Sequence, residues 1–366
     1  MAMFPPALPH FLIRWLTEPG EVVYDPFSGR GTVLLEAGLL KRIPIGSDAN
    51  PLAWILSASK ASPPDRKSAL KRITELDRTK PLRKPSEVPA HIRQLFDPGV
   101  LAQLLAIRGE LRPARTVDRF LLATLCGILH ANARKDGTPR GLTVAMPNTF
   151  SMSPRYVTNY IREKNLQPPQ VDVVEALESR VQELLSPTAL QFHGTAWLGD
   201  ARDTSYWPQR IPKASLILTS PPYLRVMKYG KMNWIRAWLI GSDPHLIDRR
   251  LFASTSLARY IEFMRQVLIS LRRKLRPDGR ICLVIGDVRE SDGNKNLAAA
   301  VIRHCLPHTD LRVQTILADR LPVEHKVSRI WGDTRGRATS TDRVVVLGGP
   351  KARELPDGPA VDWATA

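Results

Sequence analysis

Cysteine is scarce in this sequence: Cys126, Cys282 and Cys305 stand far apart among 366 residues. None of them belongs to a CxxC pair, so their spacing indicates neither a zinc site nor a disulfide framework. Each has apolar neighbours, and we expect three buried core thiols in a reducing cytoplasm. The eight histidines form no HExxH or comparable spacing, so we expect no metal site.

Long apolar runs are missing as well. The longest, Phe120 to Ala133, includes threonine, histidine and asparagine, and it is shorter than the ~20 residues that a membrane-spanning helix needs. The amino-terminal segment MAMFPPALPHFLIRWL lacks the basic start and the small-residue cleavage site of a signal peptide. The sequence therefore predicts a soluble, cytoplasmic protein without a membrane partner.

Acidic residues are the third shortage. Aspartate and glutamate number 35 against 53 lysines and arginines, which gives a formal net charge of +18. Such a surplus concentrates polyanions around a protein and favours nucleic acid as a partner, although a basic solubility surface would have the same composition. Hydrophobic residues make up 43% of the chain, which is enough for a buried core.

The chain begins with an α/β pattern. A β-branched run that ends at Asp25 is followed by a glycine-containing turn and a helical pattern, and a second strand then ends at Asp48 before another helix. This order is typical of an α/β sheet. The elements predicted here are strands at 21–24 and 43–47 and helices at 32–40 and 51–60.

A different pattern occupies the middle of the chain. Residues 62–90 are rich in proline, lysine and arginine and predict an exposed linker with a short helix, and helical periodicity then dominates. We predict a mainly helical insert at 62–188 between catalytic-domain parts at 1–61 and 189–350, with a loose tail at 351–366. Further helices are predicted at 98–112, 117–133, 171–185, 229–240, 254–275 and 294–306, and strands at 195–199, 215–219, 281–286, 311–317 and 343–347.

The turn from Asp25 to Thr32 has the sequence DPFSGRGT. Glycines between a strand and a helix let a ligand approach the backbone and the free N–H groups of the helix. The spacing is GxG without the third glycine of a dinucleotide fingerprint and without the GK[ST] of a P-loop. Asp48, at the end of the next strand, is placed to accept hydrogen bonds from ribose hydroxyls, or else to cap the helix that starts at Pro51.

A second candidate site follows the strand that ends at Thr219. Pro221 and Pro222 have fixed φ and no N–H, so they hold a rigid loop with outward carbonyls. Ser220 adds a hydroxyl and Tyr223 a flat ring, which together would form a slot for an aromatic ligand whose amino group donates hydrogen bonds. An ordinary Pro-Pro turn is the other interpretation.

These segments resemble the amino-group DNA methyltransferases, which methylate cytosine N4 or adenine N6. Residues 25–32 resemble motif I of that family, and Ser-Pro-Pro-Tyr at 220–223 resembles motif IV in the form typical of the N4-cytosine enzymes. Phe4–Pro5–Pro6–Ala7–Leu8 resembles motif X, Gly46–Ser47–Asp48 motif II, and Leu198–Gly199–Asp200–Ala201 motif III. The resemblance covers residues 1–60 and about 190–347, and the insert between them matches no known motif.

The resemblance implies a doubly wound, Rossmann-like methyltransferase sheet that binds S-adenosyl-L-methionine. It implies direct methyl transfer to an exocyclic amine of a flipped base in double-stranded DNA, without a cysteine nucleophile. The residues it assigns to catalysis are Ser220, Pro221, Pro222 and Tyr223. Those it assigns to the cofactor are Phe4, Pro6, Asp25, Pro26, Phe27, Ser28, Gly29, Gly31, Thr32, Asp48, Ala49, Asp200 and Ala201.

Basic residues near these motifs are candidates for phosphate contacts. They are Arg225, Lys228, Lys231, Arg329, Arg335 and Arg337. Motifs X and I precede motif IV, an order that resembles the α-type arrangement with target recognition in the intervening insert. Many N4-cytosine enzymes instead place motif IV first, so the role of the insert stays open. The resemblance also allows a homodimer, a cognate restriction endonuclease and a nucleoid-associated, bacterial location.

Other functions fit parts of the sequence. An N6-adenine DNA methyltransferase or an RNA amino-group methyltransferase would use a similar proline loop, although no separate RNA-binding module is visible. A non-catalytic DNA-binding protein on the same scaffold is a further alternative, which complete motifs I and IV argue against. An NAD-dependent oxidoreductase is disfavoured by the glycine spacing.

Overall fold

The computed structural model describes residues 5–80, 84–131, 141–146, 152–186, 191–222, 224, 228–290, 293–320 and 338–357. The chain forms two compact units. The first, called the sheet unit, contains Met1–Ala61, Phe192–Val226 and Phe252–Ala366. The second, called the helical unit, contains Ser62–Gln191 and Met227–Leu251. The sequence predicted a helical insert at 62–188 but did not predict that 227–251 would join it.

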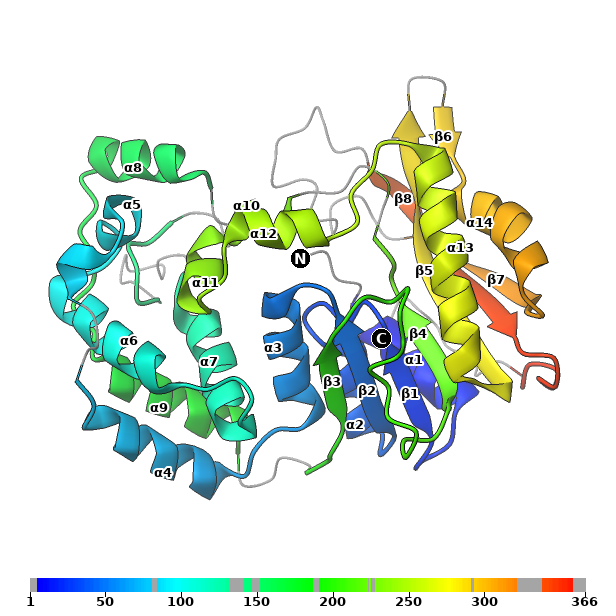
Figure 1. Cartoon of the computed structure of the whole chain (residues 1–366), viewed down its shortest axis with the longest axis horizontal. Coiled ribbons are helices and arrows are strands. Elements are labelled where there is room, and N and C mark those ends of the chain that lie inside the picture. Colours follow the sequence, from blue (N-terminus) through cyan, green and yellow to red (C-terminus); the bar gives the residue numbers. More distant parts are fainter. Residues whose placement is uncertain are drawn as a thin grey trace. The chain divides into compact units, whose positions relative to one another are not determined.

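The strands of the sheet unit run in the order β3-β2-β1-β4-β5-β8-β7, and β6 pairs with β5 outside this path (Figure 1). The pairs β1–β2, β1–β4, β2–β3 and β4–β5 are parallel, whereas β8 is antiparallel to both β5 and β7. The strand order reverses between β1 and β4, which is the place where such sheets bind ligands. The strands are β1 (Val22–Asp25), β2 (Ile43–Asp48), β3 (Thr195–Leu198), β4 (Ala214–Thr219), β5 (Leu275–Glu290), β6 (Gly293–Lys295), β7 (Arg312–Arg320) and β8 (Ala338–Gly348).

Helices cover both faces of this sheet, because its central strands are apolar on both sides. In β1, Val22 and Tyr24 pack into one core cluster and Val23 into the other. The first cluster lies under α13 (Leu257–Lys274) and α14 (Leu297–Cys305), and the second under α1 (Ala7–Leu16), α2 (Thr32–Leu39) and α3 (Pro51–Ala61) (Figure 1). The predicted fold class, a doubly wound Rossmann-like α/β sheet with a mainly helical insert, is confirmed.

In the helical unit, side-chain hydrogen bonds cap the first turn of many helices. Asp65, Asp97, Ser153, Asp172 and Asp243 each accept a hydrogen bond from a backbone N–H in the first turn. The α-helices are α4 (Arg66–Asp77), α5 (Ala90–Arg93), α6 (Pro98–Glu110), α7 (Thr116–Ile128), α8 (Pro154–Glu163), α9 (Val173–Leu184), α10 (Tyr229–Met232), α11 (Trp234–Leu239) and α12 (Pro244–Arg250). Short 3-10 helices lie at Pro85–Glu87 here and at Leu306–His308 in the sheet unit.

The later segment of the helical unit is held by α11. The Arg236 guanidinium donates a 2.9 Å hydrogen bond to the carbonyl of Cys126, and the Trp234 indole donates one to the carbonyl of Met152. The guanidinium of Arg108 lies 5.1 Å from the ring centroid of Trp238. Because Trp234 is only 4% exposed, residues 227–251 contribute to the core of this unit.

Three local predictions differ from the structure. Residues 62–90, predicted as an exposed linker with a short helix, contain α4, but this helix is not wholly exposed because it buries Ala69, Ile73 and Leu76. The strand predicted at 281–286 is part of the longer β5, which begins at Leu275 and shifts its register in the pairing with β4. The predicted helix 229–240 is divided at Asn233 into α10 and α11.

The three cysteines were expected to be buried in the core, and the structure confirms their burial. Cys126, Cys282 and Cys305 are buried and unpaired by disulfides. Burial raises the pKa of the Cys126 and Cys282 thiols to about 12, so both are inert at neutral pH. Among the described residues, no group of three or more acidic, histidine or cysteine side chains is arranged to hold a metal ion. No helix in the described part of the chain has the length and apolarity to cross a membrane.

Candidate active site

The predicted glycine turn lies at the carboxyl end of β1 and leads into α2. Gly29 and Gly31 have φ angles of 50° and 77°, in the left-handed region that favours glycine. A Cβ on Gly31 would lie 2.8 Å from the Cα of Ser57, a backbone atom that cannot move aside. Glycine at position 31 therefore meets two requirements, the left-handed backbone of the turn and the close contact with α3. It is the residue immediately before α2, which starts at Thr32.

The turn is fastened to the end of β2. The Gly29 N–H donates to Oδ2 of Asp48 at 2.9 Å, and the Asn50 N–H donates to Oδ1 of the same carboxylate at 2.9 Å. Ser28 adds two bonds to the carbonyl of Ser47, one from its N–H and one from its hydroxyl, both 3.0 Å long. The carboxyl ends of β1 and β2 thus form one hydrogen-bonded edge.

Asp48 was predicted to bind ribose or to cap a helix. The Asp48 carboxylate accepts the N–H groups of Gly29 and Asn50, both of which precede α3. The N–H of Leu52, in the first turn of α3, donates instead to the side chain of Asn50 at 3.0 Å. Burial raises the pKa of Asp48 to about 6, although both N–H bonds favour its charged form. Each carboxylate oxygen retains capacity for another donor, so ribose binding stays a prediction.

Asp25 joins this edge to β4. Its Oδ1 accepts a 2.6 Å hydrogen bond from the Thr219 hydroxyl and a 3.1 Å bond from the N–H of Phe27. The side chain is only 3% exposed. Burial raises the pKa of Asp25 to about 7, and the nearby Asp48 adds to the rise. The first residue beyond Thr219 is Ser220, so this bond links the glycine turn to the start of the Ser-Pro-Pro segment.

The Ser-Pro-Pro segment begins where β4 ends. Pro221 is buried, and Ser220 and Pro222 are half-buried. Their positions follow from β4, which is buried along its whole length and is flanked by β1 and β5. Tyr223, the fourth predicted catalytic residue, lies outside the described residues.

A buried group of hydroxyls lies beside the turn and was not predicted. The hydroxyl of Tyr24 is 2.8 Å from Oγ of Ser47 and 2.9 Å from the hydroxyl of Tyr206, which is itself 2.9 Å from Ser47 Oγ. Tyr206 follows β3 in the sequence and packs on Gly199, where a Cβ would lie 2.4 Å from its ring. The three hydroxyls connect β1, β2 and the segment after β3, and only the tertiary fold brings them together.

Asp200, predicted to bind the cofactor, forms an ion pair with Arg202 at 2.6 Å. Burial opposes its ionisation, but the hydrogen bonds and charge of Arg202 outweigh that effect, and the pKa of Asp200 is lowered overall. The Arg202 guanidinium also lies 5.6 Å from the ring centroid of Phe263. That ring is 6.0 Å from the ring of Phe27 in the glycine turn. Asp200 is therefore held near the aromatic side of the turn.

The remaining predicted cofactor residues have varied environments. Pro26 is buried, and Thr32 and Ala49 are half-buried beside the turn. Ala201 is 2% exposed and belongs to the core cluster under α13. Pro6 is exposed and precedes α1. Besides Tyr223, the predicted residues that lie outside the described part of the chain are Phe4, Arg225, Arg329, Arg335 and Arg337.

Lys60 is a half-buried cation that the sequence did not mark. Its Cδ lies 3.3 Å from the point that a Cβ on Gly31 would occupy, so its stem lines the glycine turn. Burial, and then the charge of Arg30, lower the pKa of Lys60 to about 8. Helical periodicity alone would have placed it on a solvated surface.

The two basic residues that remain, Lys228 and Lys231, belong to the helical unit. Both are exposed, and both line a hollow between α10 and α12. The backbone N–H of Lys231 donates to Asp248 at 3.1 Å.

The chain is similar to one known protein family over its first residues and to several solved structures. Residues 1–54 match the model of a protein family, N6_N4_Mtase, described as DNA methylase. A search of curated protein sequences found no match. Among solved structures, TrmN from Thermus thermophilus aligns over 94% of this chain and 49% of its own, with 13% identity and a TM-score of 0.37.

Two further solved structures are similar to parts of this chain. The rRNA methyltransferase aviRa from Streptomyces viridochromogenes aligns over 96% of this chain and 87% of its own, with 14% identity and a TM-score of 0.36. A putative DNA modification methylase, also from Thermus thermophilus, aligns over 43% of this chain and 54% of its own, with 20% identity and a TM-score of 0.25. The present chain thus spans about half the length of TrmN and of the modification methylase.

Proposed function

We propose that this protein is an S-adenosylmethionine-dependent methyltransferase that acts on the exocyclic N4 amino group of cytosine in duplex DNA. The observation that carries the proposal is the hydrogen bond between Thr219 and the buried Asp25. It ties a glycine turn to the start of a Ser-Pro-Pro segment at the point where the strand order reverses. The DNA methylase family match over residues 1–54, which includes the glycine turn, supports the same function.

The residues of the turn fit S-adenosylmethionine by their chemistry. The cofactor is cationic at its sulfonium and its amine, and Asp25 and Asp48 are two carboxylates whose pKa burial has raised. A cation beside them would favour their charged forms. The half-buried Phe27 offers an apolar surface, and the start of α2 offers backbone N–H groups to a carboxylate. When bound, the cofactor supplies an electrophilic methyl group.

The target amine must be oriented, because its lone pair is delocalised into the ring and it is a poor nucleophile. In our proposal the Ser220 hydroxyl and the Pro221 carbonyl accept hydrogen bonds from this amine, which directs its lone pair towards the methyl carbon. The two prolines fix the local φ angles, so little reorganisation is needed. Tyr223 would stack on the base. The bound cofactor would supply the methyl group, its S–C bond breaking with the electron pair left on sulfur as the N–C bond forms, and the amine would give a proton to solvent. Because the amine is inaccessible inside a duplex, the base is flipped out.

The helical unit is the candidate for target recognition, and α8 is the helix best suited to it. The rings of Tyr156 and Tyr160 are stacked at 6.0 Å with an interplanar angle of 19°. Arg155 and Asn159 are exposed on the same helix, whereas Val157 is buried and anchors it. Amide and guanidinium groups can read base edges, and tyrosines can stack on bases. A homodimer and a cognate restriction endonuclease stay predictions of the family resemblance.

The test is mass spectrometry of nucleosides from duplex DNA incubated with the protein and methyl-labelled S-adenosylmethionine. We expect labelled N4-methylcytosine, roughly 100-fold less of it with Ser220→Ala, and no change with Ser68→Ala, a control on the exposed face of α4. Labelled N6-methyladenine would move the target to adenine. Label in RNA only, or no label despite cofactor binding, would reject DNA modification.

A further inference from the structure

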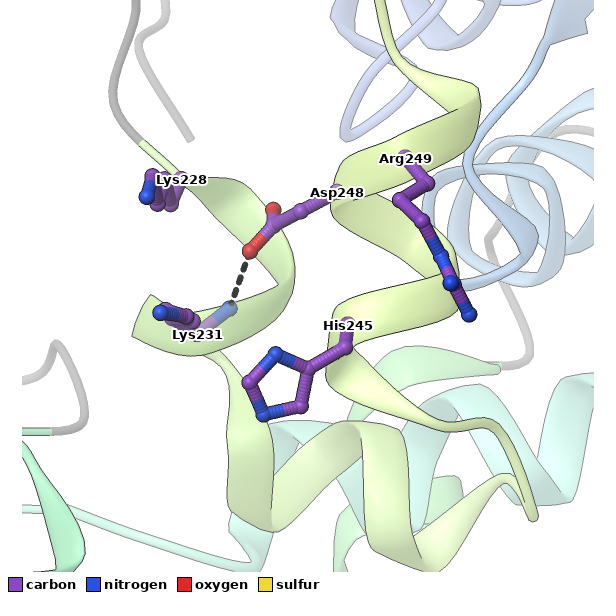
Figure 2. Close-up of a pocket in the computed structure, with 5 residues that line it drawn as sticks. All are labelled: Lys228, Lys231, His245, Asp248 and Arg249. Atoms are coloured by element: carbon purple, nitrogen blue, oxygen red, sulfur yellow. Dashed lines mark hydrogen bonds between the residues drawn. The ribbon is translucent and has the colours of Figure 1, made fainter.

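Two short helices of the helical unit enclose a basic hollow. The hollow lies between α10 and α12, has a volume of about 510 Å³, and is lined by Lys228, Lys231, His245, Asp248 and Arg249. Figure 2 shows the two lysines on the α10 side and the other three side chains on α12, with Asp248 reaching across towards α10. Neither His245 nor Arg249 was a candidate in the sequence.

The walls of the hollow are fixed by one carboxylate. Asp248 accepts hydrogen bonds from the N–H groups of Gly230 at 2.7 Å and of Lys231 at 3.1 Å. Figure 2 shows the second of these bonds. A Cβ on Gly230 would lie 2.0 Å from the carbonyl oxygen of Pro244, so only glycine permits this approach of α10 to α12. These contacts hold α10 against α12 and so fix the walls of the hollow.

The cations of the hollow are not paired with an acidic side chain among the residues that the structure describes. Both oxygens of Asp248 face backbone N–H groups, and no ion pair involves Lys228, Lys231 or Arg249 within the part of the chain that the structure describes. These three side chains and His245 are exposed. The two lysines and Arg249 bring three positive charges to the lining against the single carboxylate of Asp248, so an anion with several oxygen acceptors is the ligand that would stabilise it.

We propose that this hollow binds a phosphodiester group of the DNA backbone and anchors the duplex to the helical unit. The inference rests on the proposed function, because that function supplies duplex DNA as the polyanion. The exposed lysines and Arg249 suit a continuous backbone, which approaches from solvent, and the net charge of +18 favours such a partner. Lys228 and Lys231 follow the Ser220–Tyr223 segment closely in the sequence.

The experiment compares a hollow variant carrying Lys228→Gln, Lys231→Gln and Arg249→Gln with the control Arg250→Gln. Arg250 is exposed on the same helix but does not line the hollow. Fluorescence anisotropy gives the Kd for a labelled DNA duplex of about 20 base pairs between about 50 and 300 mM KCl. Wild-type and hollow-variant unfolding curves establish that both are folded.

We expect the hollow variant to bind DNA roughly tenfold more weakly or worse at about 100 mM salt, with a salt dependence of log K that is smaller by about one unit or more. Arg250→Gln should stay within about twofold of wild type. Wild-type affinity and salt dependence in the hollow variant would overturn the anchor while DNA methylation by the wild type still stood. If the hollow variant loses affinity for an RNA hairpin but not for DNA, the assignment to duplex DNA is overturned. No binding of wild type to DNA would overturn both proposals.

Discussion

Thr219 Oγ1 lies 2.6 Å from Asp25 Oδ1, and neither side chain is open to solvent. One residue ends β4 and the other ends β1, so the bond closes the carboxyl edge of the sheet between two neighbouring parallel strands. A hydrogen bond to a buried carboxylate is strong because water does not compete for either partner. The bond therefore contributes both to the stability of the sheet unit and to the placement of the two loops that follow these strands.

Replacing Thr219 by valine tests this contribution. Valine has nearly the same shape but no hydroxyl, so Asp25 would retain only the N–H of Phe27 as a donor. We expect the free energy of unfolding to fall by about 1–3 kcal/mol and S-adenosylmethionine to bind more weakly. Urea denaturation and calorimetry measure the two effects. Thr219→Ser keeps the hydroxyl and is the control; equal values for valine and serine would show that the bond is unimportant.

The raised pKa of Asp25 predicts how stability changes with pH. The folded-state pKa of about 7 is above the ordinary 3.8, so the folded state binds this proton more tightly, and stability falls as pH rises from about 4 to 7. Asp25→Asn keeps an acceptor for Thr219 and removes the charge. We expect the asparagine variant to be more stable than wild type at pH 8, by up to about 4 kcal/mol, and less so at about pH 5.

The measurement is the unfolding free energy of both proteins at several pH values. Asp48, with a pKa of about 6, contributes in the same direction below that pH, so the comparison from about pH 6 to 8 isolates Asp25. An identical pH dependence of wild type and variant in that interval would contradict the prediction. Because a cationic cofactor favours the carboxylates, wild-type affinity for S-adenosylmethionine should also fall as pH decreases through about 7 and 6.

At Gly20 a side chain would cause backbone strain alone, whereas at Gly31 it would cause both backbone strain and a steric clash. Gly20 has a φ of 85° with nothing within 4 Å of a built Cβ, whereas Gly31 combines a φ of 77° with a 2.8 Å approach to Ser57. Gly20→Ala should cost about 1–2 kcal/mol of stability and leave cofactor affinity unchanged. Gly31→Ala should cost more and weaken cofactor binding roughly tenfold or more. Similar thermal unfolding and similar affinity of the two variants would argue against a special role for the turn.

Most of the sheet could be predicted from the sequence, because the features that mark its strands and turns are local. The parallel strands β1, β2 and β4 are short and mostly apolar, and Asp25, Asp48 and Thr219 stand at their ends, where the pattern predicts them. The glycine turn follows from its two glycines. These features depend on neighbours in the chain, so periodicity and turn chemistry suffice to find them.

Other features depend on distant residues and were missed. Helix α8 has a buried residue in Val157 but is polar on average, so no apolar run marks it in the sequence. A short helix was predicted where α4 lies, but the burial of Ile73 and Leu76 in that lysine- and arginine-rich segment was not. Tyr206 meets Tyr24 only when β1, β2 and the segment after β3 are assembled. The membership of 227–251 in the helical unit depends on Trp234 and Arg236, whose partners lie far earlier in the chain.

The interleaved order of the two units has a consequence for synthesis. Translation delivers β1 and β2 first, but the strand that pairs with the other edge of β1 begins at Ala214. The helical unit in turn waits for α11 and α12 from the segment that ends at Leu251. A nascent chain on the ribosome therefore carries the unpaired backbone edge of β1 through the synthesis of the entire insert, and chaperones have a long interval in which to bind it.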